Sequence, residues 1–102
     1  MPEPTLDALE TVFAQVVAGM DKDEFDSHEF ILKLACDHQH LYVNALAAYA
    51  GTNRPFQIVH GEIAKRLLTY EGLVTKVGET ASEDIFGHVN TCAAWRRVAQ
   101  PG

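Results

Sequence analysis

The hydrophobic pattern of this chain changes from helical to alternating after Gly72, and this change limits the fold more than any other feature of the sequence. Up to Gly72, apolar residues recur at spacings of three and four, which places them on one face of a helix. Residues 73–77 then form a short apolar and β-branched run that Gly78 closes, a pattern typical of a strand. Helices followed by strands predict an α+β domain that is mainly α.

Three to four helices are expected in the first part of the chain. Thr5 can cap an N-terminal helix over 5–19, which carries one continuous apolar stripe. The remaining helices form a helical core over 26–72. The last of them is expected over 55–70, because Pro55 suits the first position of a helix.

The segment 26–50 has two interpretations. Asp26 and Glu29 form the D-x-x-E pattern of a capping box at its start. Apolar residues keep helical phase from there to residue 50, which is compatible with one long helix. Weak helix formers at 37–40 favour a break instead, with Asp37 as the cap of a second helix. We prefer two helices, because shorter helices pack more easily in a domain of this length.

The segment 73–98 is expected to form a C-terminal β-hairpin as strand, loop and strand. Residues 79–83 are predicted to be a polar loop, and 91–98 the returning strand, with a short helix as the alternative. Ile85 and Phe86 are expected to hold the loop against the core. The predicted core consists of Leu9, Phe13, Val16, Ile31, Leu34, Leu41, Leu46, Phe56, Val59, Ile63, Leu67, Val74, Ile85 and Phe86.

The length of 102 residues predicts a single domain over 1–102. No apolar run approaches the roughly 20 residues that cross a membrane, so no membrane contact is expected. The acidic N-terminus lacks the positive start of a secretory signal. The two cysteines, Cys36 and Cys92, are therefore expected to be reduced thiols in a cytoplasmic protein, although a bridge between them stays open.

Charge is divided unevenly along the chain. Residues 1–50 carry nine acids and two lysines, and residues 51–102 carry five acids and six basic residues, for a net charge of −6. This division predicts two surfaces of different character and a protein partner with a basic surface. The expected contact residues are Asp21, Asp23, Glu24 and Asp26, with Trp95 as a half-exposed anchor. A special case of protein binding is a homodimer in which the apolar stripe of helix 5–19 packs against a second copy of the chain.

The order of the predicted elements is similar to that of a winged-helix domain, which suggests double-stranded DNA as an alternative partner. Helix 55–70 would be the recognition helix and 73–98 the wing. The net charge of −6 opposes this alternative, as do Glu62 and Glu71 on that helix. The side chains expected to contact DNA are Arg54, Gln57, His60, Lys65, Arg66, Lys76, Arg96 and Arg97.

Metal binding and catalysis have less support. Cys36 and His40 are four residues apart, as are His88 and Cys92, so each pair would share a face of a helix and together offer a zinc-like set of ligands. Cysteine is more often a small buried hydrophobe. The sequence contains no glycine-rich phosphate loop or nucleophile elbow. We therefore expect a small, non-enzymatic binding or regulatory domain without a cofactor.

Overall fold

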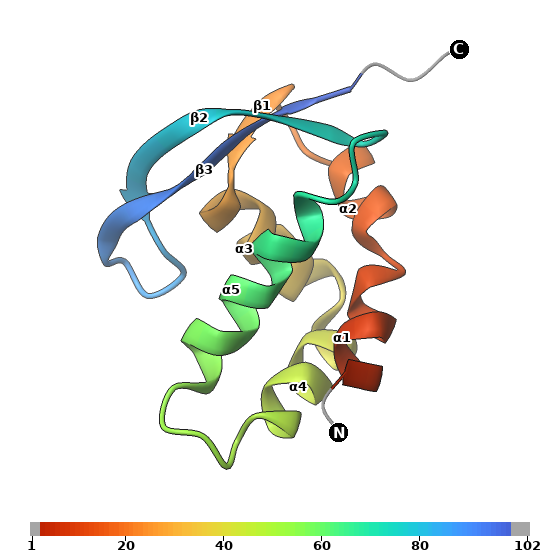
Figure 1. Cartoon of the computed structure of the whole chain (residues 1–102), viewed down its shortest axis with the longest axis vertical. Coiled ribbons are helices and arrows are strands. Elements are labelled where there is room, and N and C mark those ends of the chain that lie inside the picture. The colour runs from red at the N-terminus through yellow and green to blue at the C-terminus, as the bar shows by residue number, and fades with distance from the viewer. Residues whose placement is uncertain (1–2, 99–102) are drawn as a thin grey trace.

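Five helical segments carry a three-stranded antiparallel sheet at one end (Figure 1). The computed structural model describes residues 3–98, so residues 1–2 and 99–102 of the predicted domain lie outside the described residues. The expected class, α+β and mainly α with a C-terminal hairpin, is confirmed. The elements are α1 (Glu3–Glu10), α2 (Phe13–Ala18), β1 (Glu24–Asp26), α3 (Ser27–Asp37), α4 (Gln39–Ala48), α5 (Pro55–Leu67), β2 (Val74–Glu83) and β3 (Val89–Arg97).

Local signals in the sequence account for the starts of α3 and α5. The capping box is present: the Glu29 N–H donates to Asp26 Oδ1 at 2.9 Å, and the Asp26 N–H donates to Glu29 Oε1 at 3.0 Å. Pro55 is the first residue of α5, as expected. The preferred break between two helices is confirmed, but its cap was wrongly predicted. His38, with φ −133°, separates α3 from α4, and Asp37 is the last residue of α3.

The single helix predicted over 5–19 is wrong, because the chain breaks between α1 and α2. The hydroxyl of Thr11 donates to the carbonyl of Ala8 at 2.6 Å, and the Val12 N–H bonds only to the carbonyl three residues earlier. A side chain that bonds the preceding turn competes with regular helix formation, and two β-branched residues in succession add to this effect. The apolar stripe nevertheless continues across the break.

That stripe is buried inside the chain. Leu6, Leu9, Phe13 and Val16 are each at most 2% exposed. The stripe therefore packs on the protein's own core and offers no surface to a twofold mate, which corrects the expectation of a dimer through helix 5–19. Among the described residues, no helix is long and apolar enough to cross a membrane.

The acidic segment before α3 contains a strand that the sequence analysis missed. β1 pairs antiparallel with β3, and Phe25 lies opposite Trp95. The sheet order is therefore β1-β3-β2. A strand between the second and third helices therefore pairs with the last strand of the chain. This pairing joins residues 24–26 to the C-terminal hairpin and completes the winged-helix-like topology.

The hairpin spans the predicted region, but its strands are longer than predicted. Residues 79–83 extend β2 as a strand and do not form a loop, and β3 begins at Val89. A register shift between Lys76 and Gly78 bends β2, and Gly78 has φ +151°, a conformation that favours glycine.

One large residue of the core, Trp95, was predicted to lie at the surface. Trp95 is 2% exposed, and its indole Nε1–H donates to Ser27 Oγ at 2.9 Å. The prediction of a half-exposed anchor is wrong, because the pairing with β1 turns this side chain toward the helices. Phe86, predicted to be core, is 52% exposed. Nine other predicted core residues are buried, while Leu41, Leu46, Phe56 and Ile85 are only partly buried.

Replacing the buried indole tests this correction. Trp95→Ala is expected to lower the free energy of unfolding by about 3–5 kcal/mol, because it leaves a large cavity and removes the hydrogen bond to Ser27 Oγ. Phe86→Ala removes an exposed ring and should cost less than about 1 kcal/mol. Urea denaturation measures both. Equal losses in the two variants would contradict the buried role of Trp95.

Candidate functional site

A cleft of about 570 Å³ opens between α5 and the beginning of β3. The first turn of α3 and the loop over 84–88 close its other sides. We call it the α5–β3 cleft. Side chains with hydrogen-bonding or ligand chemistry line it, among them Arg54, Gln57, His28, His60, His88, Asn90 and Cys92.

The loop that borders the cleft is fixed by its own hydrogen bonds. The tip of the hairpin turns back toward α5 (Figure 1), where the rings of Phe56 and Phe86 meet edge to face with their centroids 4.8 Å apart. Asp84 Oδ1 accepts the N–H groups of Phe86 and His88 at 2.9 and 3.0 Å, and its Oδ2 accepts Asn90 Nδ2 at 3.1 Å. The backbone hydrogen bond from His88, followed by that from Phe86, lowers the pKa of Asp84. These internal hydrogen bonds therefore hold the loop at the border of the cleft in place.

One wall of the cleft contains a buried pair of polar side chains. Tyr42 Oη lies 2.6 Å from His60 Nε2, and the two rings are stacked. Burial raises the pKa of Tyr42 to about 12. Burial also lowers the pKa of His60; Asp84 opposes this shift and His28 adds to it. Both groups are therefore uncharged at neutral pH, and the tautomer of the imidazole sets which of the two donates.

Small residues leave the α5 wall open. Gly61 and Ala64 both line the cleft on this helix. A Cβ atom at Gly61 would meet no other atom of the described residues within 4 Å. Glycine inside a helix costs about 1 kcal/mol relative to alanine. No packing contact within the described chain explains why this position has glycine and not the more stabilising alanine.

The structure brings together only part of the residues predicted to contact DNA. Arg54, Gln57 and His60 line the cleft. Of the eight Lys and Arg residues, Arg54 is the only one without an ion pair within residues 3–98. The other predicted cations pair with acids as follows: Lys65 with Glu62, Arg66 with Asp7 and Glu10, Lys76 with Glu79, Arg96 with Glu24, and Arg97 with Asp23.

Two of these arginines have structural positions. Arg97 Nη1 donates to the carbonyls of Val17 and Met20, both at 3.0 Å, and so satisfies groups at the C-terminal end of α2. Arg66 Nη1 lies 2.6 Å from Glu10 Oε2, and its side chain is only 20% exposed. It joins α5 to α1 and points away from the cleft. The predicted grouping of these cations on one exposed face is therefore wrong.

The predicted acidic surface is also partly internal. Asp26 is 8% exposed and caps α3, so it is not a surface residue. Asp23 and Glu24 are exposed but paired with Arg97 and Arg96. Of the four predicted acids, only Asp21 neither caps a helix nor forms an ion pair within residues 3–98. It lies beside a groove over α3. The acidic and basic parts of the sequence meet in space, which corrects the expectation of two separate charged surfaces.

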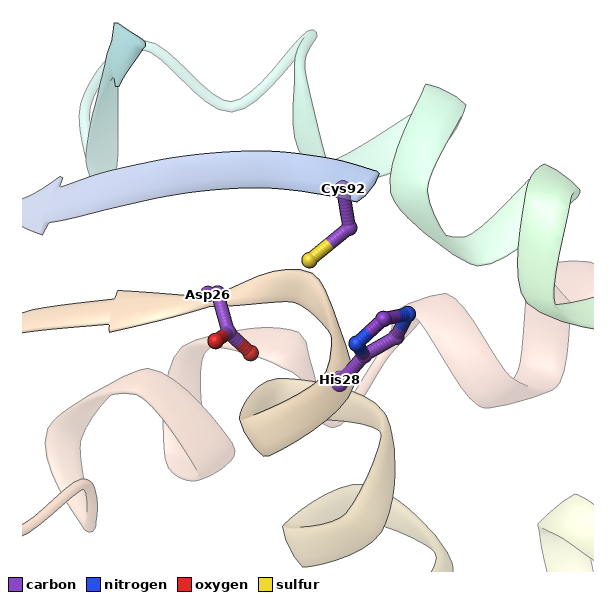
Figure 2. A group of neighbouring side chains, drawn as sticks. All are labelled: Asp26, His28 and Cys92. Atoms are coloured by element: carbon purple, nitrogen blue, oxygen red, sulfur yellow. The ribbon is translucent and has the colours of Figure 1, made fainter. Parts of the chain in front are cut away.

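The four predicted metal ligands do not come together. Cys36 lies in the groove over α3, and His40 contacts Asn44, while His88 and Cys92 line the α5–β3 cleft. Among the described residues, the one group of three close metal-ligating side chains is Asp26, His28 and Cys92 (Figure 2). Both cysteines are free thiols, so no bridge joins them.

The sequence analysis predicted Cys92 as a metal ligand and Asp26 as a protein contact, and it missed His28. The capping box places His28 in the first turn of α3, and that signal was present in the sequence. Its position beside Cys92 depends on the pairing of β1 with β3, which local patterns do not show.

The chain matches none of the protein-family models, curated proteins or solved structures with which we compared it.

The partly buried imidazole of His60 makes stability depend on pH. Because the pKa of folded His60 lies below the usual value of about 6.5, folding favours the neutral ring. That stability is fully present above about pH 6.5 and is lost as the pH falls through the folded pKa. His60→Gln does not titrate, so its free energy of unfolding should decrease less between about pH 7 and pH 5. Equal decreases in the wild type and the variant, measured by urea denaturation, would exclude this coupling.

Proposed function

We propose that this protein is a small, non-enzymatic binding domain that receives an extended segment of a partner protein in the α5–β3 cleft. The observation that carries the proposal is Gly61. It occupies an unfavourable position inside α5, nothing in the described chain fills the space beside it, and that space belongs to the cleft. A partner that approaches the helix backbone closely would account for a glycine there.

The opposite wall suits a segment in extended conformation. β1 pairs only with Ala94, Trp95 and Arg96, so residues 89–93 of β3 have a strand neighbour on the β2 side alone within the described chain. Residues 90–93 line the cleft. A peptide can add to such an edge through its main chain, while side-chain pockets supply selectivity. Asn90 and Gln57 offer further hydrogen bonds.

The charges support a protein partner. Because almost every cation is paired internally, the surface lacks the free Lys and Arg residues on which binding to phosphates depends. Arg54 is available at the cleft, where its guanidinium can donate to carbonyls of a bound segment. The net charge of −6 would speed the approach of a basic partner. Two free thiols are consistent with a reducing compartment such as the cytoplasm.

Filling the cleft at Gly61 separates binding from folding. Gly61→Met adds a side chain whose Cβ atom meets no other atom of the described residues within 4 Å, and a better helix former should keep the melting temperature unchanged or raise it. A library of random linear peptides is selected on the wild type. Fluorescence anisotropy then measures the affinities of the selected peptides, which should be at least about tenfold weaker for the variant.

Lys65→Met is the matched control, since it introduces the same side chain at an exposed position on α5 that does not line the cleft. Its affinity should equal that of the wild type. The proposal fails if no peptides are selected, or if the selected peptides bind Gly61→Met as tightly as the wild type.

Duplex DNA is a second candidate, favoured by the winged-helix-like topology of the described residues. In this case α5 would enter the major groove. Only Arg54 and Lys65 of the predicted cations are placed to contact phosphates from α5, because Arg66 is joined to α1.

This alternative has a separate test. Binding of a random-sequence duplex, measured by fluorescence anisotropy at low and moderate salt, should weaken as salt rises. Arg54→Ala and Lys65→Ala should each reduce the salt dependence by about one phosphate contact. Arg66→Ala is not suitable, because it would disturb the contact between α1 and α5. A lack of binding at low salt would exclude DNA.

A further inference from the structure

Three ligand-bearing side chains from different elements converge beside the cleft. Asp26 lies at the end of β1, His28 in the first turn of α3, and Cys92 on β3. One ligand atom from each lies within 4.8 Å of the other two. Figure 2 shows the sulfur of Cys92 directed between the carboxylate of Asp26 and the ring of His28.

The geometry points to a binding site for one zinc ion, with Asp26, His28 and Cys92 as its protein ligands. Thiolate, imidazole and carboxylate are the three side-chain groups that bind zinc in proteins. Tetrahedral zinc, with bonds of about 2.0–2.3 Å, places its ligand atoms roughly 3.5 Å apart. The present atoms lie within 4.8 Å of one another, so the proposal requires their side chains to rotate closer together when the ion binds.

The charges of the site match the ion. A thiolate and a carboxylate carry two negative charges, and the neutral imidazole adds none, so a divalent cation is fully compensated. On binding, Cys92 forms its bond to the ion as the thiolate and releases its proton to solvent. Asp26 is 8% exposed, and the partial burial of the other two ligands limits competition by water. The adjoining cleft leaves a fourth position for water.

Neighbouring groups already orient the ligands. Asp26 Oδ1 accepts the Glu29 N–H, which fixes the carboxylate and leaves its second oxygen for the ion. Ser82 Oγ lies 2.7 Å from His28 Nδ1 and 3.8 Å from Cys92 Sγ. The ion would replace this hydroxyl as the partner of the ring nitrogen, and the hydroxyl could then donate to the thiolate, an outer contact of the kind that tunes metal affinity.

A catalytic triad of the same residues fits the geometry less well. A triad needs the carboxylate on the ring nitrogen remote from the nucleophile. Here one ligand atom of each residue lies within 4.8 Å of the other two, and within residues 3–98 no hydrogen bond joins His28 to Asp26 or to Cys92. A metal ion needs its ligand atoms grouped in this way, whereas a triad needs them in a hydrogen-bonded chain.

Cobalt(II) is the probe for the test, since it takes the tetrahedral geometry of zinc and gives a thiolate-to-cobalt charge-transfer band. Titration of the full chain, purified without metal, should give this band with saturation at one ion per chain. Zinc should displace the cobalt and raise the melting temperature of the protein. Cys92→Ser should lose the band, whereas Cys36→Ser, which removes the other free thiol, should retain it.

Asp26→Asn separates binding from folding, because asparagine caps a helix about as well as aspartate but carries no charge. Its melting temperature without metal should stay close to that of the wild type, and its cobalt affinity should fall at least about tenfold. His28→Gln should also lose affinity. The proposal is overturned if the wild type takes up no cobalt, if the band persists in Cys92→Ser, or if Cys36→Ser abolishes it. None of these measurements requires a partner peptide, so their failure leaves the proposed function untouched.

Discussion

The packing of Trp95 against the start of α3 is the constraint on which the rest of the structure depends. Its indole lies in the core and donates to Ser27, and the strand pair of Phe25 with Trp95 sets the register of the sheet. Because side chains alternate along a strand, this register also fixes the direction of Cys92, three residues earlier. A shift of one residue would turn the thiol away from His28. The hairpin, the border of the cleft and the metal-ligating group therefore share one anchor.

Charge has a different role in the fold from the one that its distribution along the sequence suggests. β1 lies beside β3, so Glu24 meets Arg96, and Asp23 meets Arg97. Exposed pairs of this kind contribute less than about 1 kcal/mol each. Their larger effect is on function, because they neutralise the cations that a nucleic acid would need. The surface that remains distinctive is the α5–β3 cleft with Arg54, which has no ion pair in the part of the chain that the structure describes.

The features that could be predicted are those that neighbouring residues determine. The capping box at Asp26 and the helix start at Pro55 depend on a few consecutive positions, and both are present. The break at Thr11 follows from one hydroxyl that competes with the backbone, which the apolar stripe conceals. β1 and the burial of Trp95 arise from pairing between distant segments, so no local pattern marks them. The same long-range pairing brings His28 beside Cys92, which explains why this residue was missed.

The proposed ion site and the proposed peptide site share two side chains. Cys92 and His28 line the cleft and also belong to the metal-ligating group. An ion that fixes these side chains would change the wall against which a partner segment packs, and a bound segment would change the exposure of the ion's open position. If one ligand alters the affinity of the other, thermodynamic linkage requires the reverse effect to have the same size. In a domain with this arrangement, the affinity for a partner would depend on whether the metal ion is bound. Both proposed ligands would contact β3, along the edge that lacks a strand neighbour within the described chain.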